Sequence, residues 1–240
     1  METSDLDFIQ NLRQVKKAPF KGNIFKCQFN LQQYNDNLVF PLLGQKIDLK
    51  LCNAVSKRKA EFVAGRYMAK FCLEQHGISA THLPIGANRA PVWPHNIIGS
   101  ITHTNHTAIC ATAEKSAYRY LGIDVEAILS EQTAQQIAGA ILVSNEHHLV
   151  SALDTPDTLI LTLIFPVKES LFKALYPDVQ QYFDFDAAQV LEIDFTNQKI
   201  QLELVKSLTT ELLAGTHFTA YFDVNEQQVF TLLFSAQPQL

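Results

Sequence analysis

The sequence lacks the short motifs that identify the commonest enzyme classes. It contains no G-x-S-x-G, no P-loop and no G-x-G-x-x-G. These motifs belong to serine hydrolases, nucleoside triphosphatases and dinucleotide-dependent enzymes, so those classes are disfavoured. Cysteine is also scarce, because the 4 cysteines lie far apart and form no C-x-x-C pair. Neither a zinc knuckle nor a redox dithiol is therefore indicated.

Long hydrophobic runs and a secretion signal are absent as well. The longest apolar run, LILTLIF, covers only residues 159–165, and the N-terminus, METSDLDFIQ, is acidic where a secretion signal would be basic. A membrane-spanning helix needs about 20 predominantly apolar residues. We therefore expect no membrane association and a cytoplasmic location.

The chain does have an uneven distribution of charge. Its 240 residues are 47% hydrophobic and 18% charged, which is typical of a globular protein with a substantial core. Residues 1–70 hold 12 Lys and Arg against 6 Asp and Glu, whereas residues 71–240 hold 7 against 18. This asymmetry indicates either separate sites for anions and cations or a device for solubility. No nucleic-acid partner is expected, because the basic region lacks interleaved aromatic residues and the pI is near 5.9.

The order of the expected elements divides the chain into two halves, residues 1–119 and 120–240. Each half runs from helix to β-strands joined by short connections, which favours antiparallel sheets and an α+β fold. In the first half we expect a helix over 54–77 and strands over 97–103 and 107–113, followed directly after the boundary by a strand over 120–128. In the second half we expect helices over 130–153 and 167–177, with a kink or restart at Pro166, and strands over 187–194, 199–205, 217–223 and 228–235.

Two acidic residues stand two positions apart on the strand expected over 120–128. Asp124 and Glu126 would point to the same face, while Ile123 and Val125 would face the core. Mg²⁺ characteristically takes one or two protein carboxylates together with waters and phosphate oxygens. Alone, the pattern is equally compatible with a solvated strand face.

A second pair lies on the expected helix over 167–177. Glu169 and Lys173 are four residues apart and share one helix face. They could form an ordinary exposed ion pair, worth about 0.3–0.5 kcal/mol. Alternatively, Glu169 could complete a three-carboxylate cage with Asp124 and Glu126, which would leave Lys173 to contact a phosphate or leaving oxygen.

Candidate anion ligands lie in the first half. Arg58 and Arg66 fall within one 120° arc of the helix, and guanidinium groups suit phosphates. A solvated helical face is the alternative, and we prefer it for the neighbouring lysines. His103 ends a strand whose small and hydroxyl-bearing residues could let a phosphate approach the backbone, although a single histidine is more often structural.

Taken in order, four segments of the chain resemble the phosphopantetheinyl transferases, specifically the enterobactin-synthase and surfactin-type group. The resemblance extends over much of the chain. The segments are RKAEF with AGR (58–66), RAPVWP (89–94), GSITH (99–103), and GIDVE (122–126) followed by KESLFKA (168–174). The chain departs from the pattern at Asn96, where many relatives have glycine, and at Pro166.

This resemblance implies a reaction and a fold. The reaction is transfer of the 4′-phosphopantetheine arm of coenzyme A to a serine of an apo acyl, peptidyl or aryl carrier protein, with release of adenosine 3′,5′-bisphosphate. The fold is a pair of α+β subdomains related by a pseudo-twofold axis, each with helices on a small, mainly antiparallel sheet. Coenzyme A would lie in the cleft between them, and a monomer is expected because one chain can form the complete cleft.

The resemblance also implies roles for individual residues. The Mg²⁺ ligands would be Asp124, Glu126 and Glu169, and Lys173 would meet the α-phosphate. Glu169 is also the leading candidate for the base that accepts the serine proton, with Lys168 as a possible assistant. The residues implied to hold the nucleotide and phosphates in the first half are Arg58, Arg66, Arg89, Thr102 and His103.

Two other functions remain open from the sequence. A Mg²⁺-dependent phosphatase or nucleotide hydrolase could use the same carboxylates. A catalytically silent module that binds coenzyme A or a carrier protein is the second alternative, although intact carboxylates and Lys173 argue against it.

Overall fold

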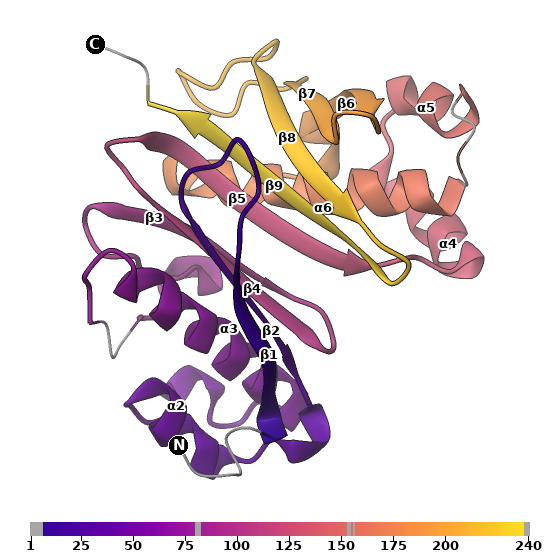
Figure 1. Cartoon of the computed structure of the whole chain (residues 1–240). Helices are drawn as coiled ribbons and strands as arrows, with labels where there is room; N and C mark the ends of the chain where they lie inside the picture. Colours follow the sequence, from indigo (N-terminus) through magenta and orange to yellow (C-terminus); the bar gives the residue numbers. More distant parts are fainter. Residues whose placement is uncertain (1–6, 80–82, 153–154, 156, 238–240) are drawn as a thin grey trace. The chain divides into compact units, whose positions relative to one another are not determined.

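A computed structural model describes residues 7–79, 83–152, 155 and 157–237 of the chain (Figure 1). The chain divides into two compact units, Met1–Tyr118 and Arg119–Leu240. Each unit packs helices against an antiparallel sheet, so the expected α+β class with two sheet-and-helix subdomains is confirmed. Within the described residues, no helix combines the length and apolar character needed to cross a membrane.

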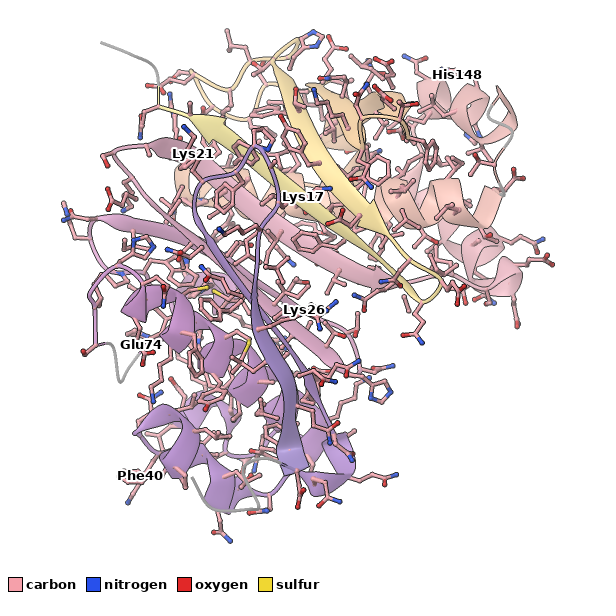
Figure 2. All side chains as sticks on the ribbon, in the orientation of Figure 1. Lys17, Lys21, Lys26, Phe40, Glu74 and His148 are labelled. Carbon is pink, nitrogen blue, oxygen red and sulfur yellow. The ribbon has the colours of Figure 1, made fainter. Side chains whose placement is uncertain are left out.

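The first unit is built on a four-stranded sheet with the order β1-β2-β4-β3. All of its neighbouring strands are antiparallel. Its strands are β1 (Ile9–Val15), β2 (Asn23–Phe29), β3 (Ile97–His103) and β4 (Thr107–Glu114). The sequence pattern predicted β3 and β4 but neither β1 nor β2. The connection between β1 and β2 carries Lys17 and Lys21, and β2 carries Lys26 (Figure 2).

The main helix of this unit, α3 (Ser56–Glu74), packs against β2 and β4. Its buried face includes Val63 and Met68, which join Cys27 and Cys110 from the sheet in one apolar core. The expected helix over 54–77 is therefore confirmed with slightly narrower bounds. The smaller helices of the unit are α2 (Val39–Leu43) and the 3₁₀ turns η1 (Leu31–Gln33), η2 (Asp36–Leu38), η3 (Leu49–Leu51) and η4 (Ala87–Arg89).

The second unit is built on a five-stranded sheet with the order β5-β9-β8-β7-β6. Its strands are β5 (Tyr118–Ala127), β6 (Ala188–Asp194), β7 (Lys199–Leu204), β8 (His217–Val224) and β9 (Gln228–Ala236). Its helices are α4 (Glu131–Ile141), α5 (His147–Ala152) and α6 (Asp157–Val179), with 3₁₀ turns η5 (Ser144–Glu146) and η6 (Phe185–Ala187). The long helix α6 packs against β9, α4 and α5 and contributes much of the apolar core.

Two expectations about these helices are wrong. The single helix expected over 130–153 is instead α4, η5 and α5, because the backbone becomes extended at Leu142 and Val143. The helix expected over 167–177 does not begin or restart at Pro166, since α6 is continuous from Asp157 to Val179. The alternative, a kink at Pro166, stays a prediction. Pro166 is buried among the core residues of α6, and this packing offsets the hydrogen bond that a proline removes.

Candidate functional site

The backbones of β5 and α6 touch at Gly122. A Cβ atom placed on Gly122 would lie 1.9 Å from the carbonyl oxygen of Ser170 and 2.8 Å from the amide nitrogen of Ala174. Only glycine fits so close an approach. Because strand residues alternate in direction, Asp124 and Glu126 continue the face on which Gly122 meets α6.

The structure corrects the prediction of which face of the strand β5 points to the apolar core. Ile123 and Val125 are fully buried, but neither belongs to the apolar core cluster of the second unit. Tyr120, which shares the face of Gly122 and Asp124, does belong to that cluster. Asp124 and Glu126 therefore lie on the face of β5 that points to the core and to α6, and not on the opposite face of the strand.

Lys173 reaches across from α6 to β5. Its Nζ donates hydrogen bonds to Asp124 Oδ1 at 2.6 Å and to the carbonyl of Ile123 at 3.2 Å. Asp124 is buried and the side chain of Lys173 is 27% exposed. The simple exposed ion pair considered for Glu169 and Lys173 is thus replaced by an ion pair between two elements.

Burial and neighbouring negative charge raise the pKa values of two of the carboxyl groups, Glu126 and Glu169. Burial, and then the charges of Asp124 and Glu169, raise the pKa of Glu126 to about 7, against the opposing effect of Lys173. Burial is also the main cause that raises the pKa of Glu169, with Lys173 opposing it and Asp124 adding to it. One ammonium therefore lies among three acidic groups.

The metal cage expected from the sequence stays a prediction. Over the described part of the chain, no group of three or more His, Cys, Asp or Glu residues is arranged to hold a metal ion. The structure does bring Asp124, Glu126 and Glu169 close enough to interact electrostatically, but the ammonium of Lys173 lies beside Asp124.

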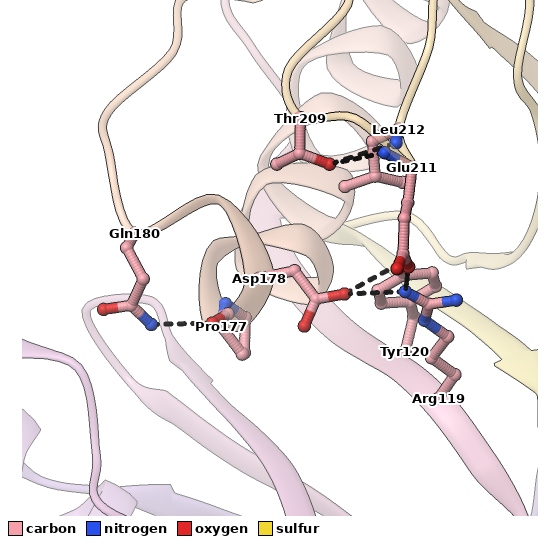
Figure 3. A network of polar contacts seen from close by, with 8 residues as sticks. All are labelled: Arg119, Tyr120, Pro177, Asp178, Gln180, Thr209, Glu211 and Leu212. Atoms are coloured by element: carbon pink, nitrogen blue, oxygen red, sulfur yellow. Dashed lines mark hydrogen bonds and ion pairs between the residues drawn. The ribbon is translucent and has the colours of Figure 1, made fainter.

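A network of charges holds the far end of the β5–α6 contact (Figure 3). Arg119 Nη2 donates to Asp178 Oδ2 at 3.2 Å and also pairs with Glu211, while the hydroxyl of Tyr120 donates to Asp178 Oδ2 at 2.9 Å. Burial and then the bond to Asp178 raise the pKa of Tyr120 to about 12. These contacts fix the position of α6 along β5, and hence of Lys173 opposite Asp124.

In the first unit, α3 and β3 bring together two of the expected phosphate ligands. Arg58 Nη1 lies 3.2 Å from His103 Nε2. Glu61 Oε2 lies 3.7 Å from Arg58 Nη1 and 3.8 Å from His103 Nδ1. Glu61 was not singled out in the sequence, although its position one helical turn after Arg58 was a usable signal. Its carboxylate lies near both basic groups.

Arg66 occupies a different environment on α3. It is 7% exposed, its Nη2 donates to the carbonyl of Pro84 at 3.4 Å, and its guanidinium lies over the ring of Phe62 at 4.9 Å. Burial lowers the pKa of Arg66 to about 10. Among the described residues, its Nε atom has no hydrogen-bond partner.

The two remaining predicted ligands of the first unit are Arg89 and Thr102. Arg89 is exposed and lies in η4 with a φ of +64°. Thr102 is buried on β3, where it pairs with Ile109 in the sheet register. Because neighbouring strand residues alternate, the side chains of Thr102 and His103 leave opposite faces of the sheet.

Comparison with protein families matches both units to one superfamily. Residues 47–113 match the 4′-phosphopantetheinyl transferase N-terminal domain, and residues 120–232 match the 4′-phosphopantetheinyl transferase superfamily. The chain belongs to this superfamily, as the ordered motifs predicted. It is a transferase that moves phosphopantetheine from coenzyme A to carrier proteins.

Individual relatives agree with this assignment. Enterobactin synthase component D of Salmonella typhi is 35% identical over 173 residues, which cover 72% of this chain and 70% of that protein. Enterobactin synthase component D of Escherichia coli (strain K12) is 32% identical over 183 residues, or 76% and 80% of the two chains. The 4′-phosphopantetheinyl transferase Npt of Nocardia iowensis is 28% identical over 142 residues, or 58% and 62%. These matches do not support the hydrolase or the silent binding module.

Proposed function

We propose that the chain uses Mg²⁺ bound by Asp124, Glu126 and Glu169 to transfer 4′-phosphopantetheine from coenzyme A to a serine of an apo acyl, peptidyl or aryl carrier protein. The second product is adenosine 3′,5′-bisphosphate. The observation that carries the proposal is the backbone contact at Gly122, because it brings β5, the strand of Asp124 and Glu126, against α6, the helix of Glu169 and Lys173.

The chemistry of this site fits Mg²⁺. Its donors are carboxylate oxygens, which hard divalent cations prefer. The ammonium of Lys173, 2.6 Å from Asp124 Oδ1, is a stand-in that marks a position favourable to a cation. Burial first, and then the charge of Asp124, raises the pKa values of Glu126 and Glu169, and a bound divalent ion would favour the charged form of both carboxylates.

The residues of the chain would then act on the substrate in the following way. When bound, Mg²⁺ supplies a charge that stabilises the pyrophosphate and its leaving oxygen. Lys173 would leave Asp124 and bind the α-phosphate. There it would donate a hydrogen bond to the leaving oxygen, on which negative charge develops. Glu169 accepts the proton of the carrier serine, directly or through a water.

The first half of the chain, residues 1–119, would bind the nucleotide and phosphates of coenzyme A. The contact between Arg58 and His103 supports these two as ligands, with Glu61 orienting them. The buried guanidinium of Arg66 supports an anion partner for this residue. Arg89 and Thr102 are supported by their motif position alone. Residues 120–240 would supply the Mg²⁺ ligands and the catalytic helix.

Carrier modification tests the proposal directly. Purified protein, Mg²⁺ and coenzyme A are incubated with apo acyl, peptidyl and aryl carrier proteins, and intact mass is measured. We expect a gain of one phosphopantetheine on at least one carrier and no gain when the metal is chelated. Release of phosphate from coenzyme A without carrier modification would instead indicate a hydrolase.

A further inference from the structure

A second ionic contact lies on α6, one residue before Glu169. The Nζ of Lys168 donates to Glu146 Oε2 at 2.7 Å, and the two side chains are 2% and 0% exposed. Lys168 also donates to the carbonyls of Ile141 at 2.8 Å and Phe185 at 3.2 Å. Its three ammonium protons therefore all have acceptors inside the second unit. Lys168 has none left for substrate, contrary to the assistance considered from the sequence.

Glu146 is equally well occupied. Its Oε2 also accepts a hydrogen bond from the backbone nitrogen of Val143 at 2.8 Å, and its Oε1 accepts one from that of Val190 at 2.6 Å. The pair thus ties α6 to the end of α4, the start of η5, η6 and β6. Buried ion pairs give little net stability compared with apolar side chains of similar volume. The main consequence of this one is geometric.

That consequence falls on Glu169. Successive helix residues leave the axis about 100° apart, so fixing Lys168 against Glu146 fixes the direction in which Glu169 leaves α6. On the other side of Glu169, the hydroxyls of Ser170 and Thr231 lie 2.7 Å apart, and Thr231 donates to the carbonyl of Pro166 at 2.9 Å. Two buried contacts therefore flank Glu169 just beyond Pro166, where a proline weakens the helix.

We propose that Lys168 and Glu146 are positioning residues whose buried ion pair directs the carboxylate of Glu169 toward Asp124 and Glu126 and thereby sets the affinity for Mg²⁺. The inference rests on the proposed function, in which Glu169 is a metal ligand. Lys168 and Glu146 act only through Glu169 and touch neither the metal nor the substrate.

The test compares Mg²⁺ affinity in two backgrounds, by titration calorimetry with coenzyme A present and no carrier. The double variant Lys168→Met/Glu146→Gln removes both charges together, so no uncompensated charge is buried. We expect it to bind Mg²⁺ about tenfold more weakly than the unmodified protein, which is the usual effect of losing groups that orient a ligand. In a Glu169→Gln background, the same double variant should change the affinity less than about twofold.

Two further variants control for folding. Lys206→Met/Asp186→Asn removes an exposed ion pair of the same unit and should leave Mg²⁺ affinity unchanged. Glu146→Asp keeps both charges but shortens the side chain by one methylene. It should weaken Mg²⁺ binding about threefold, a smaller part of the same orienting effect. Circular dichroism and melting temperature establish that each variant is folded.

The outcomes separate the inference from the function on which it rests. An equal loss of Mg²⁺ affinity in both backgrounds, or no loss in either, would overturn the positioning role while leaving Glu169 as a ligand. If Glu169→Gln alone leaves Mg²⁺ affinity unchanged, Glu169 is not a ligand, and the metal assignment fails together with the inference.

Discussion

Asp124 is the residue on which the proposed chemistry depends most directly. It is buried, it pairs with Lys173, and its charge raises the proton affinity of both neighbouring carboxylates. Asp124→Asn keeps the shape of the side chain but removes its charge. We expect carrier modification to slow by at least about 100-fold, because a metal ligand contributes several kcal/mol to the transition state.

Mass spectrometry of the carrier measures this effect, and circular dichroism checks the fold. Asp186→Asn, at an exposed carboxylate of the same unit, is the matched control and should retain full activity. A fully active Asp124→Asn variant would exclude the proposed metal site.

Glu126 gives a prediction about pH. Its pKa rises from 4.5 to about 7 in the folded protein, so the folded state binds this proton more tightly than the unfolded state. Bound protons then favour folding at low pH, and the contribution of Glu126 to stability is lost as pH rises from about 4.5 to about 7. Glu169 acts in the same direction.

Urea unfolding of the metal-free protein across this range tests the prediction. Glu126→Gln should lose less stability between pH 4.5 and pH 7 than the unmodified protein, because its amide does not titrate. Parallel stability curves for the two proteins would contradict the raised pKa.

At the scale of elements, the close contact between β5 and α6 depends on glycine at position 122, which has no Cβ atom. Gly122→Ala would place a methyl group 1.9 Å from the carbonyl oxygen of Ser170, so the strand and helix must separate. We expect a loss of about 3 kcal/mol in the free energy of unfolding and a large loss of transferase activity.

A second glycine of the same unit supplies the control. A Cβ on Gly139, in α4, would have no atom within 4 Å. Gly139→Ala should therefore stabilise the protein by about 0.5–1 kcal/mol, as expected in a helix interior, and leave activity unchanged. Chemical unfolding and the carrier assay distinguish the two variants, and equal effects would refute the close contact at Gly122.

Runs rich in β-forming residues located β3, β4 and the four C-terminal strands within a residue or two. The sequence analysis missed β1 and β2, although Phe25, Cys27 and Phe29 alternate along β2. In β1 the alternation is broken by a bulge between Gln10 and Arg13, with Asn11 at a φ of +52°. The break after α4 involves no glycine or proline, so no local signal marks it.

The part of the candidate site that depends on local spacing was predictable, and the part that depends on long-range contacts was not. A period of two residues sufficed to place Asp124 and Glu126 on one face. The reach of Lys173 to Asp124 and the burial of Glu146 against Lys168 depend on contacts between residues 22 or more positions apart. Such contacts leave no trace in local periodicity, which is why they became visible only in the structure.

For the whole molecule, the charge asymmetry follows the division into units. The unit Met1–Tyr118 holds 14 Lys and Arg against 8 Asp and Glu, whereas Arg119–Leu240 holds 5 against 16. A basic first unit favours the polyanion coenzyme A, and an acidic second unit favours a cation.

Thermal denaturation with ligands tests this distribution. Coenzyme A with Mg²⁺, each at 100 times its dissociation constant, should stabilise the protein by about 2.7 kcal/mol for each site. Arg58→Gln should remove most of the contribution of coenzyme A, because its guanidinium lies beside His103. Lys57→Gln, at a neighbouring exposed position, should not. Equal melting shifts in the two variants would contradict the assignment of Arg58.

The ion pair between Lys173 and Asp124 has a consequence for how the protein matures. One buried and two half-buried carboxylates would ordinarily repel one another during folding, and many small metal sites fold only once their ion is bound. Here the chain brings its own counter-ion, held 2.6 Å from Asp124. The second unit can therefore fold without a bound metal ion. Under the proposed function Mg²⁺ would bind afterwards, so the supply of metal would limit activity but not the amount of folded protein.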